Sequence, residues 1–99
     1  MNKSQVIKEA KKVLKIEIDS AKTLVSSFNQ SFYKVVKTIF NTQGRVVVTG
    51  IGKSGHIANK ISATFSSTGT PSQFVHPTEA SHGDLGSITS SDCILAVSN

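Results

Sequence analysis

Residues 45–56, RVVVTGIGKSGH, decide the fold of this chain. The first part, Val46–Val48, is an unbroken β-branched run, typical of a parallel strand covered on both faces. The second part is a glycine-rich turn. Apolar residues at helical spacing then continue from His56 to Thr68. A buried strand, a tight turn and a helix begin a βαβ unit.

The residues after this helix predict the rest of a parallel sheet. Gly69 and Pro71 end the helix, Gln73–Val75 is a short second strand, and Asp92–Val97 is a third. We therefore expect an α/β fold with an open parallel sheet and flanking helices, in the three-layer, flavodoxin-like arrangement. Three strands and one crossover helix leave apolar surface uncovered, so we expect the chain to be the first part of a larger domain.

Two helices are predicted before the sheet. An apolar stripe from Val6 to Phe28 indicates an amphipathic helix, with Ser4 as its N-cap. A second helix is expected from about Gln30 to Phe40, and residues 41–44 read as its stop. Its expected inward face consists of Phe32, Val35, Val36, Ile39 and Phe40. We place the domain boundary between residues 1–43, a helical segment, and residues 44–99.

Composition and charge exclude several classes of protein. The net charge of +5 comes from residues 1–45, which carry nine basic and three acidic side chains. The lysines fall on one helix face without interleaved aromatic residues, so we interpret them as a solvated face and expect no nucleic-acid partner. No apolar run approaches the roughly 18 to 20 residues of a membrane span. Lysines at the N-terminus also exclude a secretory signal, so we expect a soluble, cytoplasmic protein.

The glycine-rich turn indicates an anion site. The start of the following helix offers unpaired N–H groups and a partial positive charge, while Lys53 adds a full charge and Ser54 a hydroxyl. The spacing of Gly50, Gly52 and Gly55 satisfies the dinucleotide fingerprint, but the second strand ends without the carboxylate that fingerprint requires. A phosphate ester fits better than a nucleotide, and the nucleotide reading stays as an alternative.

A second polar stretch follows the second predicted strand and starts at the same sheet edge. His76 and His82 lie six residues apart, with Glu79 and Asp84 close by. This combination indicates proton transfer or metal ligation. A structural hydrogen-bonding role for each histidine is the alternative, and the spacing is no standard zinc signature. The single cysteine, Cys93, reads as a small core residue.

Four stretches together carry a family resemblance. Residues 48–57 (VTGIGKSGHI), 64–71 (TFSSTGTP), 74–77 (FVHP) and 82–86 (HGDLG) closely resemble the SIS (sugar isomerase) domain of arabinose 5-phosphate isomerases. The resemblance implies interconversion of D-arabinose 5-phosphate and D-ribulose 5-phosphate. This reaction feeds synthesis of 3-deoxy-D-manno-octulosonate, the eight-carbon acid sugar of lipopolysaccharide or capsule. It also implies a cytoplasmic homotetramer, often with two CBS domains after the SIS domain.

The resemblance assigns roles to matching residues. It implies that Lys53 is catalytic, that Gly69, Thr70 and His82 contact the substrate, and that His76 can hold a zinc ion the reaction does not require. The anion-site reading adds Gly52 and Ser54 as substrate-binding residues. A turn that ends the crossover helix belongs at the sheet edge away from Lys53, so Gly69 and Thr70 would reach substrate through another subunit or an oblique helix.

The reaction also requires a base. Aldose–ketose isomerisation moves a proton between adjacent carbons, and the carboxylate best suited to this task is expected beyond Asn99. We therefore expect little isomerase activity from the isolated 99-residue polypeptide. A non-catalytic, regulatory sugar-phosphate-binding module is the alternative function, because related SIS domains sense phosphosugars.

Overall fold

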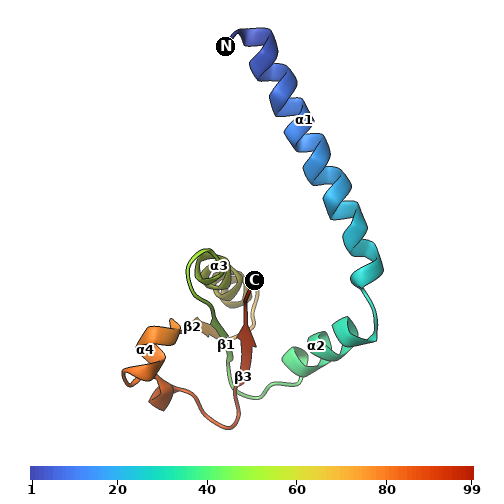
Figure 1. Ribbon diagram of the computed structural model, residues 1–99. Coiled ribbons are helices and arrows are strands. Elements are labelled where there is room, and N and C mark those ends of the chain that lie inside the picture. Colours follow the sequence, from blue (N-terminus) through green and yellow to red (C-terminus); the bar gives the residue numbers. More distant parts are fainter. The chain divides into compact units, whose positions relative to one another are not determined.

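The computed structural model describes residues 1–99, which form two compact units, Met1–Val36 and Lys37–Asn99. Figure 1 labels the elements in chain order. The helices are α1 (Lys3–Lys22), η1 (Thr23–Ser27), α2 (Gln30–Phe40), α3 (Lys53–Ser67), α4 (Pro77–Ser81) and η2 (Asp84–Ser87). The strands are β1 (Val46–Thr49), β2 (Ser72–Phe74) and β3 (Cys93–Ala96). The predicted boundary between residues 1–43 and 44–99 stays a prediction.

The start of α1 differs from the prediction. Asn2, not Ser4, is the N-cap: its side-chain oxygen accepts from the Gln5 N–H at 2.9 Å. The Gln5 side chain in turn accepts from the Asn2 N–H at 3.2 Å. This reciprocal capping box satisfies two N–H groups at once and starts the helix before Ser4, which lies in its first turn.

The single long helix expected up to Phe28 is divided. The α-helix ends at Lys22 and continues as the 3₁₀ segment η1. Within this region the Thr23 hydroxyl donates to the Ser20 carbonyl at 2.6 Å, and the Ser27 hydroxyl donates to the Leu24 carbonyl at 2.6 Å. Such side-chain bonds compete with the α-helical ladder, which explains the tighter winding.

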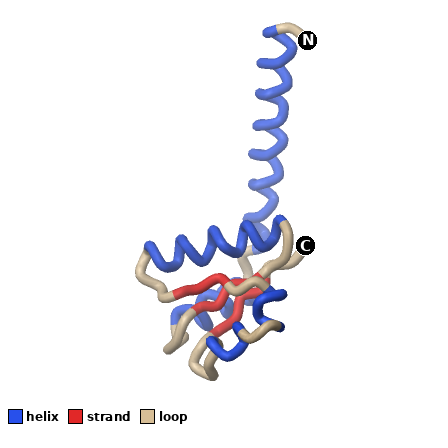
Figure 2. The backbone as a smooth tube through the Cα atoms, turned by 90° about the vertical axis from the view of Figure 1, so that its left-hand side faces the viewer, coloured by secondary structure: helices blue, strands red, loops and turns tan.

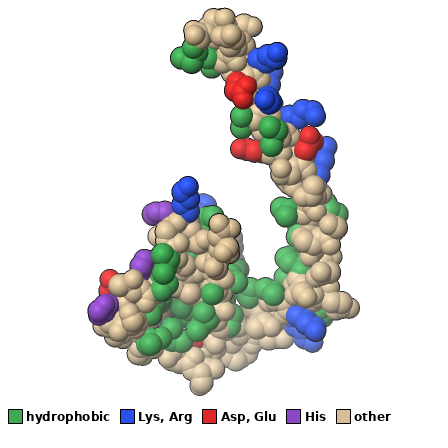
Figure 3. Space-filling model, viewed as in Figure 1, with side chains coloured by type: hydrophobic (Ala, Val, Ile, Leu, Met, Phe, Trp, Pro, Cys, Tyr) green, Lys and Arg blue, Asp and Glu red, His purple; other side chains and the backbone are tan.

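The apolar faces of the first two helices are exposed within this chain. No residue of α1 or α2 is buried, and in Figure 3 lysines and hydrophobic side chains lie on different sides of α1. The predicted inward face of α2 is therefore wrong for Phe32, Val35, Val36 and Phe40. Ile39 is the exception, because it is half-buried against the core of its own unit.

The parallel sheet is confirmed. Its strand order is β2-β1-β3, with β1 in the centre and parallel to both neighbours. Val46, Val47 and Val48 are at most 1 % exposed, as expected of a strand covered on both faces. α3 lies across one face of the sheet (Figure 2). Ala58, on this helix, is fully buried and packs in one cluster with Val46 and Val48.

The segment after β2 contains two short helices where the sequence predicted only a connection. α4 and η2 lie between β2 and β3, and the residues of η2 are exposed. β3 is an edge strand with one exposed face, on which Ile94 is 59 % exposed. The expected uncovered apolar surface is thus present. Cys93 is half-buried against the core, in agreement with its predicted packing role. No helix of the chain combines the length and apolarity needed to cross a bilayer.

One carboxylate fastens the entry of β1 to the loop before β3. Asp92 accepts from the Arg45 N–H at 2.7 Å through one oxygen and from the Thr89 N–H at 2.8 Å through the other. These two backbone bonds, the Arg45 bond first, hold the pKa of the Asp92 carboxyl below its ordinary value of 3.8. The charged form of Asp92 therefore joins residues 47 positions apart in the sequence.

This clamp predicts a pH dependence of stability. Because the folded-state pKa of Asp92 is depressed, its stabilisation is fully present above pH 3.8 and is lost as the pH falls below that value. We expect D92N to lower the free energy of unfolding at pH 7 and to flatten its pH dependence below pH 4. Urea unfolding at a series of pH values measures both effects. D84N is the matched control, because the Asp84 carboxylate makes no such backbone bonds; an equal loss in D84N would contradict the clamp.

Candidate functional site

The candidate site is built on a close approach between the end of β1 and the start of α3. A Cβ atom on Gly55 would lie 2.6 Å from the carbonyl oxygen of Gly50. A Cβ atom on Gly50 would lie 2.9 Å from the carbonyl oxygens of Ser54 and Val97. Both positions therefore require glycine for space. Gly52 requires it for conformation, because it caps α3 with φ of 63°.

The first turn of α3 presents unpaired donors. The helical ladder begins with the bond from the Gly55 N–H to the Ile51 carbonyl at 3.3 Å, followed by His56 to Gly52 at 3.2 Å. The N–H groups of Lys53 and Ser54 come before this ladder and have no carbonyl within the helix. No acidic residue lies in the first turn, and the Lys53 side chain is exposed. These groups together favour an anion.

Two cavities flank this glycine-rich turn. The first has a volume of about 410 Å³ and lies at the carboxyl edge of the sheet, between the ends of β1 and β3. Its lining, which contains no ionisable side chain, consists of Thr49, Gly50, Ile51, Ser54, Pro77, Ala96, Val97, Ser98 and Asn99. The second has a volume of about 330 Å³ and is lined by Gly52, Gly55, His56, Asn59, Phe74 and His76.

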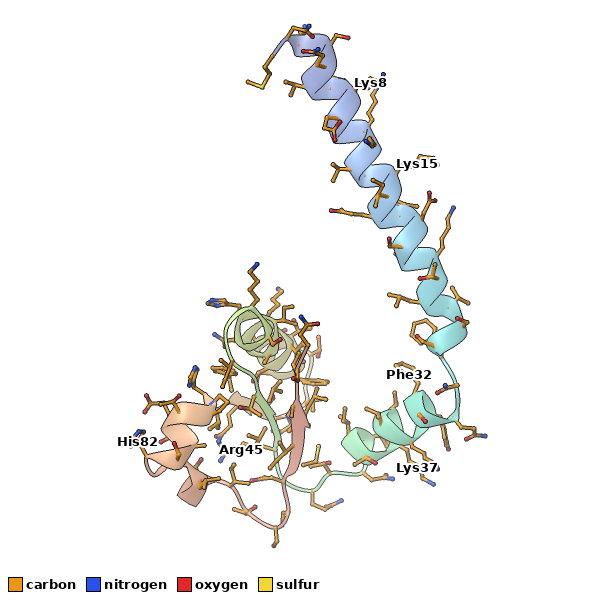
Figure 4. All side chains as sticks on the ribbon, viewed as in Figure 1. Lys8, Lys15, Phe32, Lys37, Arg45 and His82 are labelled. Atoms are coloured by element: carbon orange, nitrogen blue, oxygen red, sulfur yellow. The ribbon has the colours of Figure 1, made fainter.

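The structure separates the two predicted histidines. His76 lines the second cavity, where its ring meets the Phe74 ring edge-on with centroids 6.4 Å apart. Its Nδ1 accepts from the Thr78 N–H at 3.1 Å and thereby caps α4. His82 lies at the other end of α4, is exposed, and lines neither cavity (Figure 4). The two histidines are thus linked through α4, and of the two only His76 lines one of these cavities.

Gly69 and Thr70 lie at the end of α3 that is opposite Lys53. The helix has 15 residues, which correspond to a length of about 22 Å. Gly69 takes a positive φ of 97°, and the Thr70 N–H donates to the Phe65 carbonyl at 2.8 Å. The chain therefore brings Gly52, Lys53 and Ser54 together and leaves Gly69 and Thr70 apart from them, as the topology predicted.

The zinc ion implied at His76 does not fit the donors of this chain. Zinc in proteins takes about three or four side-chain ligands. No three His, Cys, Asp or Glu side chains converge here, and the Nδ1 lone pair of His76 is already used by Thr78. These residues do not form a zinc site by themselves.

Sequence reasoning missed three residues that line the second cavity, namely His56, Asn59 and Phe74. A signal for two of them was present. Gly52, Gly55, His56 and Asn59 follow the spacing i, i+3, i+4, i+7, which marks a single face of a helix. Two of the four are glycines and two are polar, so this face carries no apolar stripe and differs from the core-facing side of α3.

These features define a class of protein: a parallel α/β domain with a glycine-rich strand–helix turn, and free helix N–H groups, at the carboxyl edge of its sheet. A family model described as "SIS domain" matches residues 39–99. The chain belongs to the SIS domain family. A solved structure of the E. coli CFT073 protein c3406, in complex with arabinose 5-phosphate, is 43 % identical with a TM-score of 0.92, covering 100 % of this chain and 53 % of that chain.

Two curated proteins named arabinose 5-phosphate isomerase are also similar in sequence to this chain. The arabinose 5-phosphate isomerase KdsD of Yersinia pestis is 56 % identical over 90 % of this chain and 27 % of its own length. KdsD of Pseudomonas aeruginosa is 49 % identical over 100 % of this chain and 31 % of its own length. The chain therefore spans less than a third of the length of these relatives.

The close backbone approach makes a prediction about stability. G55A places a methyl group against the Gly50 carbonyl, so we expect it to lower the free energy of unfolding by about 1–3 kcal/mol. Urea denaturation of the purified protein measures this change. The control is G86A, because nothing lies within 4 Å of a Cβ at Gly86, and we expect a change within about 0.5 kcal/mol. Equal effects of the two substitutions would contradict the packing argument.

Proposed function

We propose that this chain supplies the phosphate cradle of a sugar-phosphate isomerase that interconverts D-arabinose 5-phosphate and D-ribulose 5-phosphate. The single observation that carries the proposal is the turn of residues 50–55, where bare glycine backbone, the free N–H groups of Lys53 and Ser54, and the exposed Lys53 side chain follow one another at the start of α3. Two relatives that are 56 % and 49 % identical to this chain carry the name arabinose 5-phosphate isomerase, which supports the choice of substrate.

In this proposal the residues divide the chemistry. The N–H groups of Lys53 and Ser54 hold the phosphate, with Gly52 leaving room for its approach. The Lys53 ammonium stabilises the negative charge that develops on the enediolate oxygen when a proton moves between C1 and C2. His82 orients hydroxyl groups or assists ring opening. Gly69 and Thr70 contact the substrate of a neighbouring subunit in a homotetramer.

The proposed setting follows from the same family. The reaction serves synthesis of the eight-carbon acid sugar of lipopolysaccharide or capsule, and the protein acts in the cytoplasm without nucleic-acid or membrane partners. The isomerisation requires no cofactor, since a general base and an oxyanion donor suffice for proton transfer between adjacent carbons.

The general base is not among the residues lining the cavity between β1 and β3. None of these side chains is ionisable, and Glu79 and Asp84 are exposed on α4 and η2. We therefore expect the 99-residue polypeptide to bind arabinose 5-phosphate without converting it. Calorimetry measures the binding and a ribulose 5-phosphate assay the turnover. Arabinose without its phosphate is the control ligand. Substantial turnover by the polypeptide would contradict the statement that the residues lining this cavity supply no general base.

The same lining favours a second candidate function. A cavity that is lined without any titratable side chain is suited to a regulatory module, which senses a phosphosugar without converting it. A turnover assay on a polypeptide as long as the curated relatives distinguishes the two functions. An isomerase converts the bound sugar phosphate, whereas a sensor binds it and releases it unchanged.

Lys53 can be tested directly. K53A removes the charge beside the free N–H groups, and we expect at least about a tenfold weaker affinity for arabinose 5-phosphate. The matched control is K60A, because Lys60 lies on the same helix seven residues further along and is also exposed. Titration calorimetry at fixed ionic strength compares the two variants. If K60A weakens binding as much as K53A, the effect is general electrostatics and the cradle is refuted.

A further inference from the structure

We propose that His76 is a positioning residue, which fixes α4 through its Nδ1 and thereby fixes His82 at the other end of that helix. The role of His82 toward substrate rests on the function proposed above. The capping role of His76 does not, because it follows from the hydrogen bonds and ring contact described here.

The first step of the argument is the weakness of α4 without a cap. It has five residues, and helices this short are unstable in water because nucleation costs more than the few hydrogen bonds return. No residue of α4 is fully buried, and only Pro77 and Ala80 are half-buried, so packing alone does not account for the helix. The bonds that define it are local, such as Ala80 N–H to the His76 carbonyl at 3.0 Å and His82 N–H to the Glu79 carbonyl at 3.0 Å.

The second step is the anchoring of His76. The Val75 side chain is 6 % exposed, and its N–H donates to the Val48 carbonyl at 3.0 Å, which ties the preceding residue to the central strand. The His76 ring lies edge-on to Phe74 and is half-buried. Pro77, at the first helical position, carries a fixed φ and no N–H. The Nδ1 bond to the Thr78 N–H therefore joins a rigid sheet edge to the first free donor of α4.

The third step is the tautomer. An Nδ1 that accepts a hydrogen bond carries no proton, so the neutral imidazole holds its proton on Nε2. Neither nitrogen then has a lone pair free for a metal. Zinc could bind His76 only after the proton moves or the Thr78 bond breaks, and either change removes the cap from α4. Capping and metal ligation at His76 are thus mutually exclusive.

The experiment compares H76A with H76N in the purified protein. Asparagine is among the best N-cap residues and supplies an acceptor oxygen without an imidazole, whereas alanine supplies no acceptor. We expect H76A to raise the amide exchange rate of Thr78 and Ala80 about three- to thirtyfold and to make the His82 backbone amide more mobile in ¹⁵N relaxation. We expect H76N to restore both to wild-type behaviour. H56N is the matched control, since it removes an imidazole from the same cavity without touching the cap.

The outcomes separate the readings. Failure of H76N to rescue α4, or a wild-type ¹⁵N spectrum with the His76 proton on Nδ1, would overturn the proposal. So would saturation of His76 by one equivalent of Zn²⁺ while Thr78 exchange stays slow. Titration with arabinose 5-phosphate forms a separate arm: if H76A weakens binding and H76N does not, positioning acts on the ligand. If the wild type fails to bind the sugar phosphate, the proposed function fails while the exchange and relaxation results still decide the role of His76.

Discussion

The contact between the Gly50 carbonyl and the bare Cα of Gly55 governs the architecture of this chain. It allows the helix to begin directly behind the last residues of β1, with no loop that would carry the free N–H groups away from the sheet edge. Because β2 and β3 run parallel to β1, the segments after each strand meet at that same edge. A side chain on either glycine would push α3 outward and separate Lys53 and Ser54 from the residues that follow β3.

The fold could be predicted from the sequence wherever local composition and burial agree. The run of residues 46–48 is β-branched and fully buried, and the structure makes it the central strand. The bounds of α2 were predicted correctly, because the apolar spacing and the stop at residues 41–44 indicate the same end. The N-cap of α1 was wrong, since a two-residue reciprocal bond between Asn2 and Gln5 outweighs the single hydroxyl of Ser4.

The site was less predictable because it depends on distances between elements. The glycine spacing predicted the tight turn before Lys53, because residues close in sequence are close at a turn; the anion-binding role of this turn stays a prediction. The sequence offered no reason to treat His76 and His82 differently, because they lie six residues apart and each has a carboxylate close by. The structure distinguishes them. The Nδ1 of His76 accepts a hydrogen bond from the Thr78 N–H, whereas His82 is exposed and lines neither cavity. Side-chain tautomers and cavity linings have no counterpart in a sequence pattern.

The exposure of Lys53 bears on how strongly the cradle can act. Two unit charges 4 Å apart attract by about 1 kcal/mol in bulk water and about 4 kcal/mol at the effective dielectric of a partly covered surface. The Lys53 side chain faces solvent in this chain, so the attraction of its charge for a phosphate is at the lower end. The same charge acts several times more strongly where water is excluded from around it. For the proposed function, phosphate binding through backbone donors therefore depends less on the exclusion of water than charge stabilisation by the Lys53 ammonium does.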